Sequence, residues 1–94
     1  MRRLWLLLLC AAFVPARLAV AAAASEDRGI VVSVQPPRIV IRELDGSRVR
    51  FTTSRATVVT LNGRRVRLRR LQLGDVVVIV HVGRLATAIR AIRP

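Results

Sequence analysis

The sequence has 94 residues, of which 53% are hydrophobic and 3% aromatic, with one cysteine and one histidine. Seventeen basic residues, all arginine, oppose five acidic ones, and the formal charge of +12 gives so small a chain a positive field that attracts polyanions. We expect a chain of this length to form one small domain, and the single cysteine excludes a fold held by disulfides within it.

The first 24 residues have the layout of a secretory signal peptide. A cationic start precedes an apolar run, Leu4 to Val14, that is shorter than the roughly 20 residues a membrane-spanning helix needs. Small residues then lead to Ala24, and the chain turns polar at Ser25. We predict signal cleavage after Ala24 and a periplasmic or secreted product with no transmembrane segment.

Two other interpretations of this segment stay open. The apolar run could be retained as a membrane anchor, although its length and the alanine-rich end favour cleavage. Cys10 could mark a lipoprotein, but the residue before a lipidated cysteine is small, and here it is Leu9. We therefore expect Cys10 to lie in the apolar core of the signal and to leave with it.

Cleavage after Ala24 leaves a chain of about 70 residues, near the lower limit at which one hydrophobic core supports folding unaided. Three arginines leave with the signal, so fourteen remain against five acidic residues and the net charge becomes +9. We divide the chain into a signal peptide at 1–24, a short polar lead at 25–28 and a small β-barrel domain at 29–94.

The mature chain alternates strand-forming runs with turn signals, and none of it shows a sustained helical period. Asp45-Gly46 and Asn62-Gly63 predict hairpins, because these pairs tolerate the positive φ angles of tight turns. Enrichment in β-branched residues and alternation of apolar with polar residues predict strands at 30–34, 38–42, 48–53, 57–61, 65–69, 76–82 and 85–92.

Alternation also predicts which side chains face the core. Val49 and Phe51 alternate with arginines and should point inward. Val66 and Leu68 should do the same in the next arginine-rich run. In the last strand, isoleucines at 89 and 92 are expected to be available to the core.

Short strands at close spacing suggest a small closed sheet, which also protects the strand edges. We predict an all-β fold, a small five- or six-stranded antiparallel barrel that is OB-like or SH3-like. A compact turn or single helical turn, formed by Leu68, Leu71 and Leu73, is expected to plug one end. An open two-layer sandwich is the alternative, but it would need more residues to cover both sheets.

Several strand and turn segments carry a family resemblance. They are Gly29–Val34, Ile39–Ile41, Asp45-Gly46, Thr57–Val59, Asn62-Gly63, Leu68–Val77, and Ala86 with Ile89. With them the chain resembles a class of exported bacterial domains of unknown function, small β-barrels often repeated in tandem in lipoproteins and surface proteins. The resemblance covers Gly29 to Ile92 and implies a barrel in an extracytoplasmic setting, without catalytic residues. The chain departs from that class as a single copy with a heavy arginine content.

No constellation of residues points to catalysis, a cofactor or a metal ion. His81 is the lone imidazole, with no second type of ligand at metal spacing, so we expect it to be packed or at an edge. The serines lack a glycine-flanked elbow, and Asp75 after Gly74 is explained by turn chemistry. We predict a non-enzymatic protein with no catalytic, cofactor-binding or metal-binding residues.

The arginine-rich run at 64–70 is the one pattern that predicts a binding site. On a strand, every second arginine would project from one face, about 6 to 7 Å from the next. Guanidinium groups bind phosphate and carboxylate bidentately, so such a face suits an anion, although a merely solvated outer face is the alternative. The candidate anion-binding residues are Arg48, Arg50, Arg65, Arg67 and Arg69.

We therefore predict an exported binding or structural module of the bacterial envelope whose partner is an anionic component or an envelope protein. A nucleic-acid-binding OB-like barrel is the alternative, but such barrels stack bases on aromatic side chains, and the mature chain keeps only Phe51. The run Val76 to Val82 is apolar on both faces, which predicts self-association or docking on a larger assembly.

Overall fold

The computed structural model describes residues 23–94. The predicted signal segment, the lipid-anchor alternative at Cys10 and the membrane-anchor alternative lie outside these residues, apart from the two alanines before Ser25. Within the described part of the chain, no helix is long and apolar enough to cross a membrane. Its elements are β1 (Ser25–Gln35), β2 (Arg38–Arg42), β3 (Arg48–Thr52), β4 (Val58–Leu61), β5 (Arg64–Arg65), the 3-10 turn η2 (Leu68–Arg70), β6 (Val76–Val82) and β7 (Leu85–Ile92).

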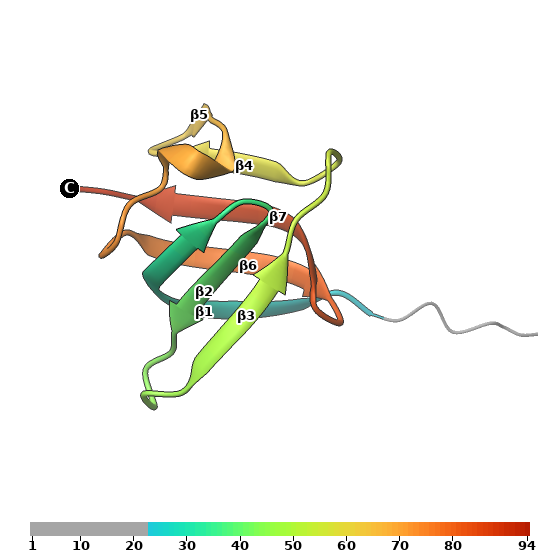
Figure 1. The fold of residues 1–94 in the computed structure, drawn as a ribbon, viewed down its shortest axis with the longest axis vertical. Helices are drawn as coiled ribbons and strands as arrows, with labels where there is room; N and C mark the ends of the chain where they lie inside the picture. The colour runs from blue at the N-terminus through green and yellow to red at the C-terminus, as the bar shows by residue number, and fades with distance from the viewer. Residues whose placement is uncertain (1–22) are drawn as a thin grey trace, which may run out of the picture.

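Five strands close into a ring in the order β1-β2-β3-β7-β6, with β6 returning to β1 (Figure 1). Numbered among themselves, the ring strands follow the order 1-2-3-5-4, which is the order of an OB barrel and resolves the choice between OB-like and SH3-like. The short hairpin of β4 and β5 lies outside the ring, with β4 against β7.

The prediction of a small all-β barrel is confirmed, with one correction to its strand directions. Neighbouring strands are antiparallel except β3–β7 and β4–β7, which are parallel. A closed ring of five strands cannot alternate direction all the way round, so at least one neighbouring pair must run parallel. Here that pair is β3–β7, joined at Thr52 and Leu85.

Strand β1 is long and pairs with two neighbouring strands. Its first half pairs with β6 and its second half with β2, with a bulge between Val31 and Ser33 where the strand bends. The strand starts at Ser25, so the segment 25–28, predicted as a polar lead, is paired with β6 instead. Gly29 lies at the crossing, where a Cβ would stand 2.5 Å from the carbonyl oxygen of Arg42.

The core follows the predicted alternation in the ring strands. Phe51 and Ile89 are fully buried. Val49 is partly buried and packs against the core. Ile92, expected to reach the core, is 62% exposed instead. Residues three apart on a strand face opposite sides, so burial of Ile89 and Ala91 turns Ile92 outward.

The segment predicted as a strand at 65–69 is mostly not one. Strand β5 ends at Arg65, and the chain then forms the 3-10 turn η2. Residues three apart eclipse in a 3-10 turn, and this places Leu68 and Leu71 together in the core. The predicted single helical turn is present as η2, and Leu68 and Leu71 are buried, whereas Leu73 is 70% exposed.

Candidate anion-binding site

The outer face of β2 and β3 carries a group of exposed arginines. On β2 the inward Ile39 and Ile41 alternate with outward residues, and on β3 Phe51 and Val49 do the same. The β6–β7 turn adds one more arginine at the end of β3, where the Thr52 N–H donates to the Arg84 carbonyl at 2.8 Å. We call this set the arginine surface; it consists of Arg38, Arg42, Arg48, Arg50 and Arg84.

Two hollows lie on the arginine surface. One is lined by Arg38 and Arg50 with Ser33, Gln35 and Val40, and its residues come from β1, β2 and β3. The other is lined by Arg48, Arg50, Thr52 and Arg84. No carboxylate lines either hollow, and none of the five arginines forms an ion pair within residues 23–94.

Arg42 and Arg48 lie directly opposite each other across β2 and β3. Like charges at opposite positions of an antiparallel pair repel, so this arrangement costs stability in the absence of an anion. A carboxylate or phosphate group between the two guanidinium groups would relieve the repulsion and could accept hydrogen bonds from both.

Of the five candidates from the sequence, Arg48 and Arg50 lie on the same exposed face of β3. Arg65 ends β5, Arg67 precedes η2 and Arg69 lies within it, so these three do not project from one strand face. Strand β3 pairs with β2 and β7, whereas β5 pairs with β4, so β3 and β5 are not neighbours. The prediction that Arg65, Arg67 and Arg69 project from one strand face is therefore wrong, because the chain leaves the sheet after Arg65.

Sequence reasoning missed three members of the arginine surface. Arg38 and Arg42 bracket a strand whose isoleucines point inward, and the Asp45-Gly46 hairpin brings that strand against β3, so their positions were readable from the predicted alternation. Arg84 gave no such signal, because only closure of the barrel between β3 and β7 brings it beside Thr52.

Four of the five acidic residues gather at one end of the barrel, on β1 and in the β2–β3 loop. Glu26, Asp27, Glu43 and Asp45 line one hollow there. A hydrogen bond with Asp27 raises the pKa of Glu43, with burial and the negative charge of Asp27 adding to the effect. Hydrogen bonds from Ser47 lower the pKa of Asp45. The acidic group bounds the arginine surface at its Arg42 end and leaves the two basic hollows without acidic lining.

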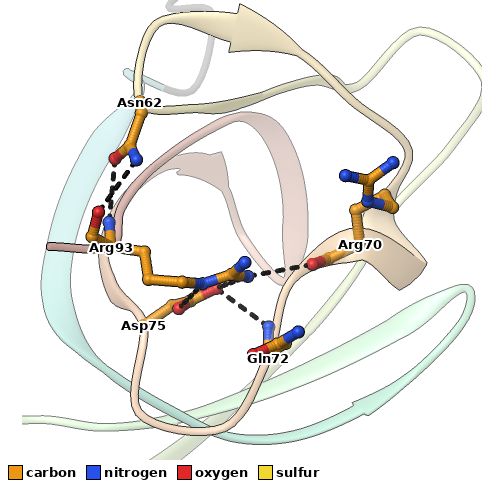
Figure 2. Close-up of polar contacts among 5 residues, drawn as sticks. All are labelled: Asn62, Arg70, Gln72, Asp75 and Arg93. Carbon is orange, nitrogen blue, oxygen red and sulfur yellow. Dashed lines mark hydrogen bonds and ion pairs between the residues drawn. The ribbon is translucent and has the colours of Figure 1, made fainter.

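The fifth acidic residue, Asp75, is buried in a polar network that Figure 2 shows. Its carboxylate accepts hydrogen bonds from Arg93 Nε and Nη2, each at 2.8 Å, and from the Gln72 N–H at 2.8 Å. Chiefly through the Arg93 bonds, the pKa of Asp75 is held below its ordinary value, against the effect of burial. The prediction of turn chemistry is confirmed by the Gln72 contact, and the pair with Arg93 was missed.

His81 is packed, as the sequence predicted. Its ring lies 4.6 Å from the Phe51 ring between centroids, and Nδ1 lies 2.8 Å from the Gly83 carbonyl oxygen, to which it donates. Nε2 lies 3.5 Å from a carboxylate oxygen of Asp27. Among residues 23–94, no group of three or more His, Cys, Asp or Glu side chains is placed to hold a metal ion.

No protein-family model matches this chain, and no curated protein matches it. Among solved structures, the chain is similar to the crystal structure of Ag(I)CusF, with 17% sequence identity and a TM-score of 0.54. The alignment covers 73% of this chain and 97% of the CusF chain. At this identity the likeness shows a shared fold, the small β-barrel already described.

Proposed function

We propose that this protein is an exported, non-enzymatic binding module of the bacterial envelope that holds an anionic partner on the arginine surface. One observation carries the proposal: Arg38, Arg48, Arg50 and Arg84 converge on two neighbouring hollows that no carboxylate lines. In OB barrels, the face of strands 2 and 3 and the loops 1–2 and 4–5 bind extended ligands. The arginine surface occupies that face, with Arg38 after the first of these loops and Arg84 in the second.

The likeness to CusF does not lead us to propose a metal ion as ligand. The CusF structure is that of the Ag(I) form, and soft monovalent cations are held by thiolate and thioether sulfur. In this chain the one methionine is Met1 and the one cysteine is Cys10, both inside the predicted signal. The described residues offer a single imidazole, whose Nδ1 donates to the Gly83 carbonyl, and no group of three or more His, Cys, Asp or Glu side chains among them is placed to hold a metal ion.

Nucleic acid is the second candidate class, because OB barrels bind oligonucleotides on the same face. Binding of single strands depends on aromatic side chains that stack on the bases. Phe51, the one aromatic residue among those described, is fully buried and points away from the arginine surface. We therefore favour an anionic partner without base stacking.

Export is supported by the place where the domain starts. Strand β1 begins at Ser25, so cleavage after Ala24 would remove no residue of the barrel. The test is the intact mass and compartment of the protein expressed in a bacterial host. A periplasmic species that begins at Ser25 would support export, and an uncleaved cytoplasmic species would contradict it and favour nucleic acid as the first ligand to try.

Anion binding is tested with two double variants that remove the same charge. Arg48→Gln with Arg50→Gln changes the arginine surface, whereas Arg65→Gln with Arg67→Gln changes the end of β5 and the residue before η2. Binding of inorganic polyphosphate is measured by anisotropy over a range of salt concentrations. We expect the first variant to weaken binding about tenfold and to lower the salt slope by about two, and the second to change affinity much less.

Equal losses in the two double variants would mean that net charge alone attracts the probe. Unchanged binding in both would show that the arginine surface is only solvated. Either result overturns the proposed site.

A further inference from the structure

Among residues 23–94, nothing pairs with most of the edge of β3 that faces away from β2. Strand β3 pairs with β2 at all five of its residues, but with β7 only at Thr52. From Ala88 onward β7 pairs with β4 instead, so the two strands diverge. In Figure 1, β3 runs beside β2 and meets β7 only near its arrowhead.

Backbone hydrogen bonds show which groups of β3 point to this edge. The Thr53 N–H donates to the Pro37 carbonyl at 2.7 Å, on the β2 side, and the Thr52 N–H donates to the Arg84 carbonyl at 2.8 Å, on the opposite side. Direction alternates along a strand, and the β2–β3 register has no shift. The N–H and C=O groups of Arg50 and Arg48 therefore point away from β2, as those of Thr52 do.

The open edge borders a basic hollow. Arg48, Arg50, Thr52 and Arg84 line it, and all four are exposed. An occupant must supply negative charge to the three guanidinium groups. It must also supply alternating donors and acceptors to the backbone of Arg48 and Arg50, which lie two residues apart, about 6.8 Å along the strand. A peptide strand carries both kinds of group at that spacing, whereas polyphosphate carries acceptors alone.

We propose that an extended acidic peptide segment of a partner protein binds as an added strand along the open edge of β3. Its backbone pairs with Arg48 and Arg50, and carboxylates at every second position face the arginines. This mode of strand addition takes affinity from main-chain hydrogen bonds and specificity from alternate side chains. The proposal rests on the proposed function of the arginine surface and names the class of its partner.

The test compares two substitutions at one position. Arg50→Gln removes the guanidinium group, and Arg50→Pro removes the guanidinium group and the outward N–H. The N–H of Arg50 takes no part in the β2 ladder, and proline is tolerated on an edge strand in such a position. The probes are a capped peptide of about eight residues that alternates glutamate with threonine, the same peptide N-methylated at every second residue, and inorganic polyphosphate.

For the unmethylated peptide, we expect Arg50→Pro to bind about tenfold more weakly than Arg50→Gln, while the two variants bind polyphosphate equally. N-methylation in the register that faces β3 should cost about tenfold with the unsubstituted protein, and both methylation registers are tested. In hydrogen exchange, the amides of Arg48 and Arg50 should become protected when the peptide is added.

Equal peptide affinity in Arg50→Pro and Arg50→Gln, or tight binding of both methylated peptides, would overturn strand addition. Binding of polyphosphate without binding of the peptide would overturn it too, but would leave the proposed function standing. If neither the peptide nor polyphosphate binds, both strand addition and the proposed function are refuted. If Arg50→Pro does not fold, as judged by its unfolding transition, the methylated peptides and the exchange of Arg48 decide the question with the unsubstituted protein.

Discussion

Arg93 and Asp75 form a bidentate ion pair that ties the end of β7 to the turn before β6. Arg93 Nε and Nη2 each donate to one carboxylate oxygen of Asp75 at 2.8 Å, and the same Nη2 reaches the Arg70 carbonyl at 3.1 Å (Figure 2). The Asp75 side chain is 3% exposed and the Arg93 side chain 32%. The pair therefore joins β7, η2 and β6 at the end of the barrel where Leu68 and Leu71 pack.

We expect the two partners to differ in what their removal costs. Asp75→Asn keeps an acceptor for the Gln72 N–H and leaves Arg93 partly hydrated, so the loss in free energy of unfolding should be about 1–2 kcal/mol. Arg93→Gln leaves a buried carboxylate without its cation and should cost more. Urea unfolding measures both.

Arg90→Gln is the matched control, because Arg90 and Glu26 form an exposed pair at 3.9 Å. Its effect should be below about 0.5 kcal/mol. Equal effects of Arg93→Gln and Arg90→Gln would show that the buried pair does not stabilise the barrel.

The free energy of unfolding should fall in acid because Asp75 becomes protonated. Its pKa in the folded state is below the ordinary 3.8, so its contribution is present above that value and is lost as the pH falls through the lower folded pKa. Unfolding free energies between about pH 5 and pH 2 should drop in the unsubstituted protein and drop less in Asp75→Asn.

A variant of Glu43 is the control that distinguishes the effect of Asp75 from general unfolding in acid. Its pKa is raised above the ordinary 4.5, so its contribution is present below that value and is lost as the pH rises through the raised folded pKa. Glu43→Gln should alter the pH dependence of the free energy of unfolding above about pH 4.5. It should not change the fall of that free energy between about pH 5 and pH 2. If Asp75→Asn shows the same fall in the free energy of unfolding between about pH 5 and pH 2 as the unsubstituted protein, Asp75 is not its cause.

Asn62 should stabilise the hairpin in two ways. It adopts a φ of 52° in the turn, and its side chain both accepts from the Arg93 N–H and donates to the Arg93 carbonyl at 2.8 Å. Asn62→Ala loses both advantages and should cost about 2 kcal/mol, whereas Asn62→Gly keeps the backbone freedom and should cost about 1 kcal/mol. Equal unfolding midpoints for the two variants would exclude a backbone contribution.

Gly29→Ala should disturb the β1–β2 crossing. The added Cβ would meet the Arg42 carbonyl oxygen at 2.5 Å, and that atom belongs to the backbone and cannot turn away. We expect a loss of about 1–3 kcal/mol, with amide chemical shifts displaced at Arg42. Gly63→Ala is the comparison, since nothing lies within 4 Å and only its φ of 86° is strained; its shifts should stay in the hairpin.

Self-association should depend on salt. Ile30, Val76 and Ile92 form one exposed apolar row across β1, β6 and β7. The net charge of +9 on the barrel opposes contact between copies until salt screens it. Sedimentation velocity should show association that rises with salt and is reduced by Val76→Ser. Val58→Ser, on β4, is the control, and a sharply monomeric protein at high salt would refute the prediction.

The local pattern of the sequence was sufficient for most of the sheet. Alternation placed Phe51 inward and the neighbouring arginines outward, since a strand presents successive side chains to opposite faces. Asn62-Gly63 marked its hairpin, because both residues take positive φ there. These features depend on residues close together in the chain, and they could be predicted without knowledge of the neighbours.

Other features depend on which strands meet. The run 65–69 alternates like a strand, yet the chain leaves the sheet after Arg65 because Leu68 and Leu71 pack against the core. Closure of five strands required the parallel pair of β3 and β7, and that pair brings Arg84 to the arginine surface.

The sequence by itself thus determined that this protein is a small, strongly basic, all-β domain, and it determined which side chains of β3 face inward. Only the tertiary structure decided that Arg84 joins Arg48 and Arg50 on one surface and that Arg93 pairs with Asp75. Composition and alternation are properties of single segments. The grouping of side chains from distant segments follows from strand order and barrel closure, which arise only when all the strands pack around one core.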